Sequence, residues 1–415
     1  MLDLSEVSHV IGANHWSGEI NQLYRPSSIV PSESQNIVYF FNSLRSPKYL
    51  PVALKEWFSL VKVTGYLVLD YKEGEGLSWQ TIEESMWWLH KAQYTIVYHD
   101  TVACSAFKPV SEKSLFAEIK SYSNRNGFAD TPVSKGTLMR FVCQKNISSQ
   151  MPSDSIDKWS FGIISNGQRD DWTAQIITSI RKQKIPHYEI LICGRYGGDV
   201  GKDTRIIPFS DRDSLGWITR KKNLLARASR YENLCLLHNR MLLADGWYEG
   251  MKKWGNTFEV LNTIQTQKIN GKRGNSWEET TLAFYRKLSM YTPRTIFHFT
   301  ANLDYKDWGK YIMTYGQSII IKRRIVLQVP LNETLYWKTP EDHLFSYDLV
   351  DRGYILRLNP FSELINLDSK NWGTDTHLLF SPTSRGRESG PLVKVAFRTT
   401  ILFILSRFNK LILRT

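Results

Sequence analysis

Short apolar runs alternate with amphipathic segments over the first third of the chain. Runs rich in Val, Ile, Tyr and Phe predict strands, and segments with apolar residues every three or four positions predict helices. The predicted strands are NIVYFF (36–41), GYLVLDY (65–71), YTIVYHD (94–100) and GTLMRFVCQK (136–145), with helices over 51–62 and 78–92. This alternation is typical of an α/β sheet with parallel strands.

A polar segment rich in Ser and Asp, NISSQMPSDSIDK (146–158), interrupts the pattern and predicts a linker. The alternation then resumes with strands over 161–167, 188–194, 204–209 and 232–240 and helices over 170–184 and 219–230. Because 415 residues exceed one ordinary domain, we expect a partial Rossmann-like α/β domain over 1–148 and a second α/β domain over 158–380.

The composition is that of a folded protein with an anionic partner. Hydrophobic residues make up 42% and charged residues 22% of the chain, as in ordinary soluble domains. The formal net charge of +13 favours binding to phosphorylated molecules, nucleic acid or an acidic membrane. The basic residues do not form a recognisable nucleic-acid module, so nucleic acid is not the expected partner.

The four cysteines, Cys104, Cys143, Cys193 and Cys235, are far apart and show no CxxC or Cys/His spacing. This favours reduced thiols in a cytosolic protein over disulfides or zinc. The first residues, MLDLSEVSHV, lack the pattern of a signal peptide, and no window reaches the ~18 apolar residues of a membrane span. We therefore expect a cytoplasmic protein.

The C-terminal segment 391–415 predicts a basic amphipathic helix. Val393, Phe397, Ile404, Phe408 and Leu411 lie along one helical stripe, and five cations lie elsewhere on the helix. Such a helix suits an anionic membrane surface, which would place the protein peripherally on the inner face of the membrane. The alternative is a terminal helix docked on the protein itself or on a partner chain.

Polar residues lie at the carboxyl ends of three of the predicted strands in the second domain. Their positions are Ser165-Asn166-Gly167, Gly194-Arg195 and His238-Asn239-Arg240. Open α/β sheets bind ligands at the carboxyl ends of parallel strands, where hydroxyl and amide groups can pair with a base or a ribose. The alternative for the first two groups is an ordinary turn and helix cap.

A basic cluster opens the predicted helix over 219–230. Arg220, Lys221 and Lys222 are followed by Asn223, which must pack inwards. If the cluster faces a cleft, it can hold a diphosphate, because phosphates attract ammonium and guanidinium groups. The alternative is a charged surface face without a specific ligand.

Glu341 and Asp342 are the catalytic candidates. They follow Pro340 at the start of an amphipathic helix, where the helix dipole favours charged carboxylates. A charged carboxylate beside an acceptor hydroxyl is suited to general-base catalysis, whereas helix capping is the simpler explanation. Upstream, Glu333 and Trp337 lie in the phrase NETLYW, and the region 254–307 is rich in aromatic residues, whose faces can stack on a ligand.

Four phrases of the second domain resemble the family 2 glycosyltransferases of the A-type nucleotide-diphospho-sugar fold, over roughly 159–365. They are Ile164-Ser165-Asn166-Gly167, Lys222-Asn223 in the family's K..ARN element, the strand that ends at His238, and TPEDHLFSYDLVDRGYIL (339–356). The resemblance implies that Asp342 deprotonates the acceptor for an inverting transfer and that Glu341 orients it or binds the acceptor. It also implies that the strand-end residues, Lys222 and Asn223 bind the donor, and that Glu333, Trp337 and the aromatic region 254–307 bind the acceptor.

The chain departs from this family where the family has a metal-binding Asp-x-Asp motif. His238, Asn239 and Arg240 occupy that place, and a guanidinium cannot ligate a metal. We expect Arg240, with Lys222, to neutralise the leaving diphosphate directly, and His238 to hydrogen-bond the ribose or a phosphate. The alternative is Mn²⁺ or Mg²⁺ held by His238 and a remote residue such as His343, so no cofactor is assigned.

The first domain resembles the second half of a Rossmann-like methyltransferase, in which a helix leads into a strand like GYLVLDY and the last hairpin ends in a phrase like LMRFVCQK. Methyltransferases of that kind hold their cofactor with a glycine-rich turn. Here the corresponding region, VIGANHWSGEI, has Gly12 and Gly18 too far apart. We therefore expect a degenerate scaffold or docking domain.

Two main hypotheses follow for the function. The first is a membrane-associated glycosyltransferase of surface polysaccharide synthesis, which moves a sugar from a nucleotide-diphosphate donor to a glycan or lipid-linked acceptor. The second is a non-catalytic nucleotide-sugar-binding or scaffold protein derived from such an enzyme. A methyltransferase that uses S-adenosylmethionine is disfavoured because the cofactor glycines are missing.

Overall fold

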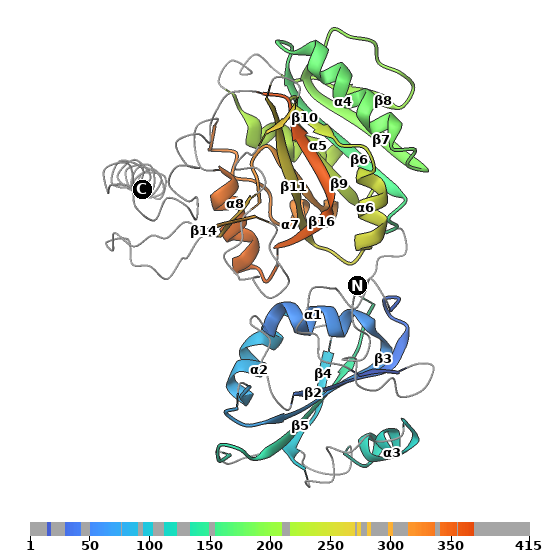
Figure 1. The fold of residues 1–415 in the computed structure, drawn as a ribbon, viewed down its shortest axis with the longest axis vertical. Coiled ribbons are helices and arrows are strands. Elements are labelled where there is room, and N and C mark those ends of the chain that lie inside the picture. Colours follow the sequence, from blue (N-terminus) through green and yellow to red (C-terminus); the bar gives the residue numbers. More distant parts are fainter. Residues whose placement is uncertain are drawn as a thin grey trace, which may run out of the picture. The chain divides into compact units, whose positions relative to one another are not determined.

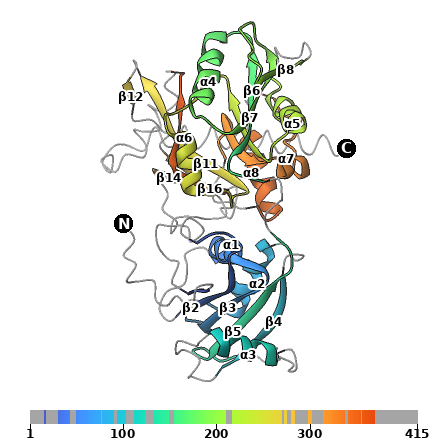
Figure 2. The same ribbon diagram turned by 90° about the vertical axis from the view of Figure 1, so that its right-hand side faces the viewer.

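The chain forms two compact units that divide between residues 152 and 153, called unit 1 and unit 2 below (Figures 1 and 2). The computed structural model describes residues 15–17, 30–42, 50–75, 77–89, 94–102, 112–122, 133–148, 154–209, 216–269, 272–274, 280–283, 298–301, 314–336, 341–354 and 356–368. The predicted tail helix 391–415 and the tryptophans 277, 308 and 337 lie outside these residues. Among the described residues, no helix is long and apolar enough to cross a membrane.

Unit 1 contains a five-stranded sheet in the order β1-β2-β3-β5-β4. Its elements are β1 (His15–Ser17), β2 (Gln35–Asn42), α1 (Leu50–Leu60), β3 (Val61–Lys72), α2 (Trp79–Met86), the 3₁₀ helix η3 (Trp87–Leu89), β4 (Tyr94–Thr101), α3 (Glu112–Tyr122) and β5 (Leu138–Lys145). Strands β2 and β3 pair in parallel, as expected, and β1, which the sequence did not predict, pairs in parallel with β2. The expectation of parallel strands is wrong for β5, which lies between β3 and β4 and runs antiparallel to both.

Helices cover both faces of the sheet in unit 1, with α1 and α2 on one side and α3 on the other (Figure 1). Under α3, the Arg140 guanidinium on β5 makes a two-pronged ion pair with Asp70 on β3, with both N–O distances 2.7 Å and both side chains buried. Glu118 of α3 contacts the same guanidinium at 2.8 Å. The antiparallel strand β5 is thus linked both to β3 and to helix α3. A relation of unit 1 to methyltransferases stays a prediction.

Buried His99 on β4 makes the stability of unit 1 depend on pH. Its ring stacks on Trp79 at 3.8 Å, its Nε2 lies 2.8 Å from the Tyr71 hydroxyl, and burial lowers its pKa to about 4. Between pH 6.5 and pH 4 the unfolded chain binds a proton on this histidine that the folded chain does not. Stability is therefore expected to fall as the pH is lowered through this range, with full stability from this group above pH 6.5.

Thermal unfolding of the wild type and of His99→Gln between pH 4 and pH 7.5 measures this effect. The variant is expected to melt at a lower temperature at pH 7.5 but to lose less on acidification, because glutamine does not titrate. An NMR titration supplies the control, since the His99 ring signal should keep its neutral shift down to about pH 5. A His99 resonance that titrates near pH 6.5 would contradict the assignment.

Unit 2 is built around a sheet in the order β10-β16-β11-β15-β9-β6-β7-β8, with β12 paired to β11. Its elements are β6 (Lys158–Asn166), α4 (Asp170–Lys182), β7 (His187–Arg195), β8 (Thr204–Ile207), α5 (Ile218–Ala228), β9 (Asn233–His238), β10 (Met241–Leu243), α6 (Trp247–Trp254), β11 (Val260–Ile269), β12 (Lys272–Gly274), β13 (Thr280–Ala283), β14 (His298–Ala301), β15 (Ser318–Lys322), α7 (Arg323–Gln328), α8 (Glu341–Asp351) and β16 (Leu356–Asn366).

The strands of unit 2 change direction at β15. Strands β9, β6, β7 and β8 are parallel, as the alternating pattern predicts. Strand β15 pairs antiparallel with β9, and β11 pairs antiparallel with β15 and parallel with β16. The mixed α/β fold class is confirmed.

The core of unit 2 holds the parallel strands in place from both faces. Apolar residues of α4 and α6 pack with Trp159 and Phe161 of β6 on one face, and α5 lies with α7 on the other (Figure 2). The approach of α5 is close, because a Cβ added at Gly162 would lie 3.1 Å from Leu225. The polar residues of α5 that point inwards are therefore held against the strand ends.

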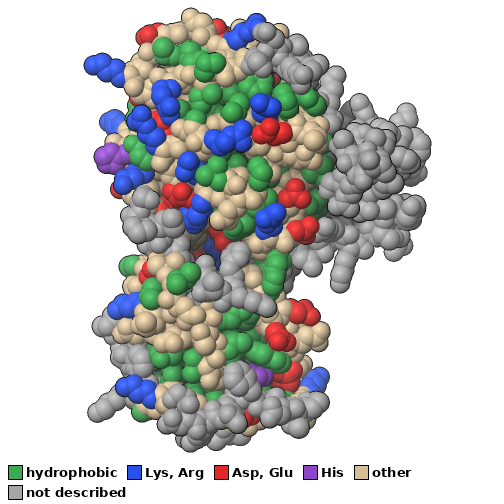
Figure 3. Space-filling view, turned by 180° about the vertical axis from the view of Figure 1, so that it is seen from behind, with side chains coloured by type: hydrophobic (Ala, Val, Ile, Leu, Met, Phe, Trp, Pro, Cys, Tyr) green, Lys and Arg blue, Asp and Glu red, His purple; other side chains and the backbone are tan. Residues whose placement is uncertain are grey.

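Charge on the surface of unit 2 is mixed. Figure 3 shows Lys and Arg side chains interspersed with Asp and Glu over the described part of one face. Some of these groups form exposed ion pairs, such as Arg181 with Asp203 at 2.6 Å. Exposed pairs of this kind contribute little to stability.

Candidate active site

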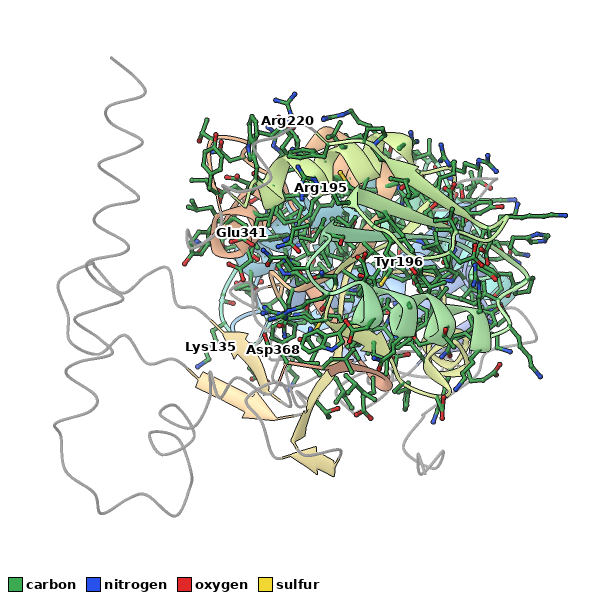
Figure 4. All side chains as sticks on the ribbon, turned by 90° about the horizontal axis from the view of Figure 1, so that it is seen from above. Lys135, Arg195, Tyr196, Arg220, Glu341 and Asp368 are labelled. Carbon is green, nitrogen blue, oxygen red and sulfur yellow. The ribbon has the colours of Figure 1, made fainter. Side chains whose placement is uncertain are left out.

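The carboxyl ends of β6, β7 and β9 meet at one edge of the sheet. In the ladders, Ile164 of β6 lies opposite both Cys193 of β7 and His238 of β9. The residues that follow these positions therefore emerge side by side. Figure 4 shows labelled residues of this region, including Arg195 at the end of β7, Glu341 at the start of α8 and Asp368 after β16.

The end of β6 forms a tight turn. The Ser165 hydroxyl accepts a hydrogen bond from the Gly167 N–H at 3.2 Å, and the Asn166 side-chain oxygen accepts one from the Gln168 N–H at 3.1 Å. Gly167 has a φ of 78°, which favours glycine. Ser165, Asn166 and Gly167 thus form the turn expected as their alternative role, and donor binding by them stays a prediction.

Gly194 lets the end of β7 lie close beside the end of β6. Its φ is 116°, and a Cβ at this position would lie 2.0 Å from the Ser165 carbonyl oxygen and 3.1 Å from the Lys221 ammonium. Lys221 donates a hydrogen bond to the same carbonyl at 2.8 Å. This buried lysine of the basic cluster joins α5 to the end of β6, while Arg195 is exposed.

Lys222 points at the acids of α8. Its ammonium donates a hydrogen bond to the Gly316 carbonyl at 2.6 Å and lies 3.4 Å from Glu341 Oε1, with 1% of the side chain exposed. The sequence placed Lys222 on the donor diphosphate. In the structure its buried ammonium contacts the Gly316 carbonyl and the Glu341 carboxylate.

Asn223 and Glu333 lie in contact, although the sequence assigned them to donor and acceptor binding. The Asn223 amide donates to the Leu331 carbonyl at 2.8 Å and to Glu333 at 3.0 Å, and it accepts from the Leu331 N–H at 3.0 Å. Glu333 also pairs with Arg227 at 3.4 Å. These contacts give Asn223 a role in holding segment 331–333, and its ligand-binding role stays a prediction, as does that of Glu333.

Gly316, just before β15, connects the two catalytic candidates to the sheet. Its N–H donates a hydrogen bond to Asp342 Oδ2 at 2.9 Å, while its carbonyl accepts from Lys222. A Cβ at Gly316 would lie 2.8 Å from Asp342 Oδ2 and 2.9 Å from Glu341 Oε1. Sequence reasoning missed this residue, because a lone glycine in KYIMTYGQS matches no motif.

The two carboxylates of α8 lie in different environments. Glu341 is buried, and desolvation raises its pKa, with Lys222 opposing and Asp342 reinforcing the shift. Asp342 is half-buried and accepts the Gly316 hydrogen bond. Asp342 is therefore the better placed of the two to meet a substrate hydroxyl.

His238, at the end of β9, contacts the segment that precedes β15. Its backbone N–H donates to the Gln317 carbonyl at 2.9 Å. Desolvation and the charges of Lys222 and Arg240 hold the His238 pKa well below its usual value, so the ring is neutral. The ring nitrogen Nε2 is buried and has no hydrogen-bond partner among the described residues.

Arg240 belongs to a second cluster beside His238. Its guanidinium lies 3.6 Å from Asp368 Oδ2, and Arg169 reaches the same oxygen at 3.2 Å. Asp368 follows β16 and was not anticipated from the sequence, since nothing along the chain links it to the end of β9. The cluster brings two guanidinium groups to the ligand-binding edge.

The residues at the end of β9 do not fit a divalent cation. His238 is surrounded by positive charges, because Lys222, Arg240 and Lys221 all lower its pKa and would repel a metal in the same way. No group of three His, Cys, Asp or Glu side chains that could hold a metal occurs among the residues that the structure describes. The side chain of His343, the alternative second ligand, lies outside those residues.

No protein-family model and no curated protein matches the chain. Solved structures do match: GalNAc-T7 with UDP, GalNAc and Mn²⁺ has a TM-score of 0.41 and 11% identity, covering 52% of this chain and 45% of that one. S. aureus TarS 1–349 in complex with UDP-GlcNAc has a TM-score of 0.34 and 12% identity, with coverage of 51% and 60%. The chain thus spans about half of the length of these proteins, and function is inferred from its own site.

Proposed function

We propose that the chain is a glycosyltransferase, which moves a sugar from a nucleotide-diphosphate donor to a glycan or lipid-linked acceptor with inversion. The observation that carries the proposal is the position of Asp342, whose carboxylate is held by Gly316 beside the ends of parallel strands. The edge that binds ligands in such sheets therefore also holds an oriented, half-buried carboxylate.

In this reaction Asp342 acts as general base. It takes the proton of the acceptor hydroxyl as that oxygen forms a bond to the anomeric carbon. The bond between the anomeric carbon and the phosphate oxygen breaks on the opposite face, which inverts the configuration. The Gly316 N–H fixes one carboxylate oxygen at 2.9 Å, so the base is oriented before the substrate arrives.

The negative charge that develops on the departing diphosphate needs a positive partner. Arg240 supplies it, because a guanidinium can stabilise a phosphate leaving group through paired hydrogen bonds. Arg169 lies in the same cluster through Asp368. Lys222, buried against Glu341, supports the carboxylates instead of the diphosphate.

The other parts of the chain fit this proposal as accessory elements. Segment 391–415, with its basic amphipathic pattern, is proposed to bring the enzyme to the anionic inner face of the membrane, where a lipid-linked acceptor lies. Unit 1 is proposed as a scaffold or docking domain. Synthesis of a surface polysaccharide is the process that joins such an acceptor to a nucleotide sugar.

A non-catalytic nucleotide-sugar-binding protein is the second candidate. The sequence His238-Asn239-Arg240 favours it, since the acidic metal motif of the resembling enzymes is missing there. Such a protein would bind the donor but leave it intact. Both candidates therefore bind the donor, but only the glycosyltransferase turns it over.

A panel of UDP-, GDP- and other nucleotide sugars tests the proposal. At least one is expected to stabilise the protein by about 2.7 kcal/mol when present at about 100 times its Kd, and to be hydrolysed slowly in the absence of acceptor. In excess EDTA the rate should stay above about half its value, because Arg240 acts in place of a cation.

Each outcome of this panel tests a different part of the proposal. Binding without hydrolysis or transfer would favour the non-catalytic candidate. Loss of turnover on chelation, with recovery on adding Mn²⁺, would overturn the metal-independent site and leave the transferase intact. A panel in which no nucleotide sugar stabilises the protein, together with unchanged behaviour of Asp342→Ala, would refute the enzyme.

A further inference from the structure

Two arginines converge on one carboxylate at the ligand-binding edge of unit 2. Arg169 Nη1 donates a hydrogen bond to Asp368 Oδ2 at 3.2 Å, and Arg240 Nη1 lies 3.6 Å from the same oxygen. Arg169 follows the turn at the end of β6, and Arg240 follows β9, the parallel neighbour of β6. Both guanidinium groups therefore come from the edge at which such sheets bind ligands.

The carboxylate lies deeper in the protein than the two cations that contact it. The exposed fraction of the side chain is 9% for Asp368, against 34% for Arg169 and 24% for Arg240. One carboxylate carries a single negative charge, so these three groups together carry one net positive charge. The cluster thus turns its cationic side, and not its carboxylate, toward solvent.

Two further contacts fix the arrangement of this cluster. The guanidinium carbon of Arg169 lies 4.3 Å from the centre of the Trp172 ring, a cation–π contact. The Leu367 N–H donates a hydrogen bond to the Arg240 carbonyl at 2.8 Å, so the backbone that carries Asp368 lies against Arg240. The cations are therefore held in place before a ligand arrives, which reduces the conformational entropy lost on binding.

The chemistry of a guanidinium group indicates which ligand fits. It offers five N–H donors in one plane, which match the oxygens of a phosphate. Arg169 uses one donor for Asp368, and its guanidinium makes no other hydrogen bond within the part of the chain that the structure describes. Because two such groups contact one oxygen, they lie close enough together to bind both phosphoryl groups of a single diphosphate.

We propose that Arg169 binds the donor diphosphate together with Arg240, and that Asp368 is the positioning residue that holds the two guanidinium groups side by side. The inference rests on the proposed function, in which the leaving group was assigned to Arg240. It adds a second cation to that site, and it makes the pair of arginines a device that selects nucleoside diphosphates over monophosphates.

Calorimetric binding to the full chain tests the role of Arg169. The probes are uridine and guanosine, their mono- and diphosphates, and inorganic pyrophosphate. The wild type is expected to bind the diphosphate of the recognised nucleoside at least about tenfold more tightly than the monophosphate. Arg169→Ala should weaken the diphosphate and pyrophosphate about 10- to 100-fold, the worth of hydrogen bonds to a charged group, and leave nucleoside binding within about twofold.

Arg181→Ala is the matched control. Arg181 lies in the last turn of α4, at the other end of the helix that Arg169 precedes. Its side chain is 39% exposed, and it pairs with a single aspartate, Asp203, at 2.6 Å. The variant therefore removes one positive charge and one ion pair of the same kind, away from the ligand-binding edge. Its affinity for every probe should stay within about twofold of the wild type.

Asp368→Asn tests the positioning role. It keeps an acceptor oxygen but loses the charge on which the two arginines converge. Removal of a negative charge would by itself favour an anion, yet diphosphate affinity is expected to fall about tenfold because the two guanidinium groups separate. The loss in Arg169→Ala/Asp368→Asn should be smaller than the sum of the two single losses, because both act through one cluster.

The possible results support or overturn the inference. Tighter diphosphate binding by Asp368→Asn would show that the carboxylate only neutralises the arginines. Equal effects of Arg169→Ala and Arg181→Ala would show a general effect of charge, and equal losses for the nucleoside and its diphosphate would show a structural role or a base contact. Each of these overturns the inference, while hydrolysis of a nucleotide sugar by the wild type still supports the proposed function. A wild type that binds none of the nucleotides overturns both.

Discussion

Replacing Asp342 by asparagine is expected to lower kcat by about 10²- to 10⁴-fold, the range that general-base catalysis supplies. Asparagine keeps a side-chain oxygen that can accept the Gly316 hydrogen bond, so the turn before β15 should remain in place. What it loses is the ability to take a proton from the acceptor hydroxyl. Steady-state transfer of sugar from the nucleotide donor identified in the panel measures the effect, and the donor Kd should change little.

A matched variant distinguishes the loss of the general base from the loss of one negative charge on α8. Asp351→Asn removes the same charge from the exposed last residue of that helix and is expected to leave kcat within about twofold. Equal losses in both variants would mean that the helix, and not the Asp342 carboxylate, matters. If Asp342→Asn keeps the wild-type kcat with an unchanged melting temperature, the base is another group.

Replacing Gly194 by alanine is expected to destabilise unit 2 by about 3–5 kcal/mol, from backbone strain together with steric overlap. The residue has a φ of 116°, and the new Cβ would fall 2.0 Å from the Ser165 carbonyl oxygen. Relief of this overlap must move β6 and β7 apart and break the hydrogen bond from Lys221 to that carbonyl. Urea unfolding of the variant measures the loss, and nucleotide binding should weaken with it.

Gly246→Ala is the control that measures the cost of the left-handed backbone conformation without steric overlap. Gly246 has a φ of 77°, but nothing lies within 4 Å of the position where its Cβ would be. Only the left-handed conformation opposes alanine there, at a cost of about 1–2 kcal/mol. Similar losses of stability at both positions would show that the contact between β6 and β7 at Gly194 is less tight than the structure indicates.

The elements that local pattern predicted well are those with strong apolar periodicity. Strands β6, β7 and β9 are nearly continuous apolar runs, because helices cover both their faces, and α4 shows a clear amphipathic repeat. Helix α3 carries Leu115, Ile119 and Tyr122 on one face. The apolar periodicity of a helix is therefore present in this segment, although no helix was predicted there. The reversed direction of β5 has no local signal, because it depends on pairing with β3 about 70 residues earlier in the chain.

The candidate site was predictable only where residues sit in motifs or at strand ends. His238 and the acids of α8 could be named from the sequence because a strand end and a helix start mark them. Gly316 and Asp368 could not, since both act through contacts with residues far away in the chain. The contacts of Lys222 could not be predicted for a similar reason: a basic cluster reveals its charge, and only the fold shows that Glu341 faces it.

Gly316 contacts Asp342 and Lys222 through the two polar groups of one residue. Its N–H donates to the Asp342 carboxylate, and its C=O accepts from Lys222, whose ammonium faces Glu341. The Asp342 carboxylate and the Lys222 ammonium are therefore spaced by the N–Cα–C bonds of one residue, whose lengths and angle hardly vary. The distance between these two charged groups thus depends on one backbone unit and not on the packing of separate loops.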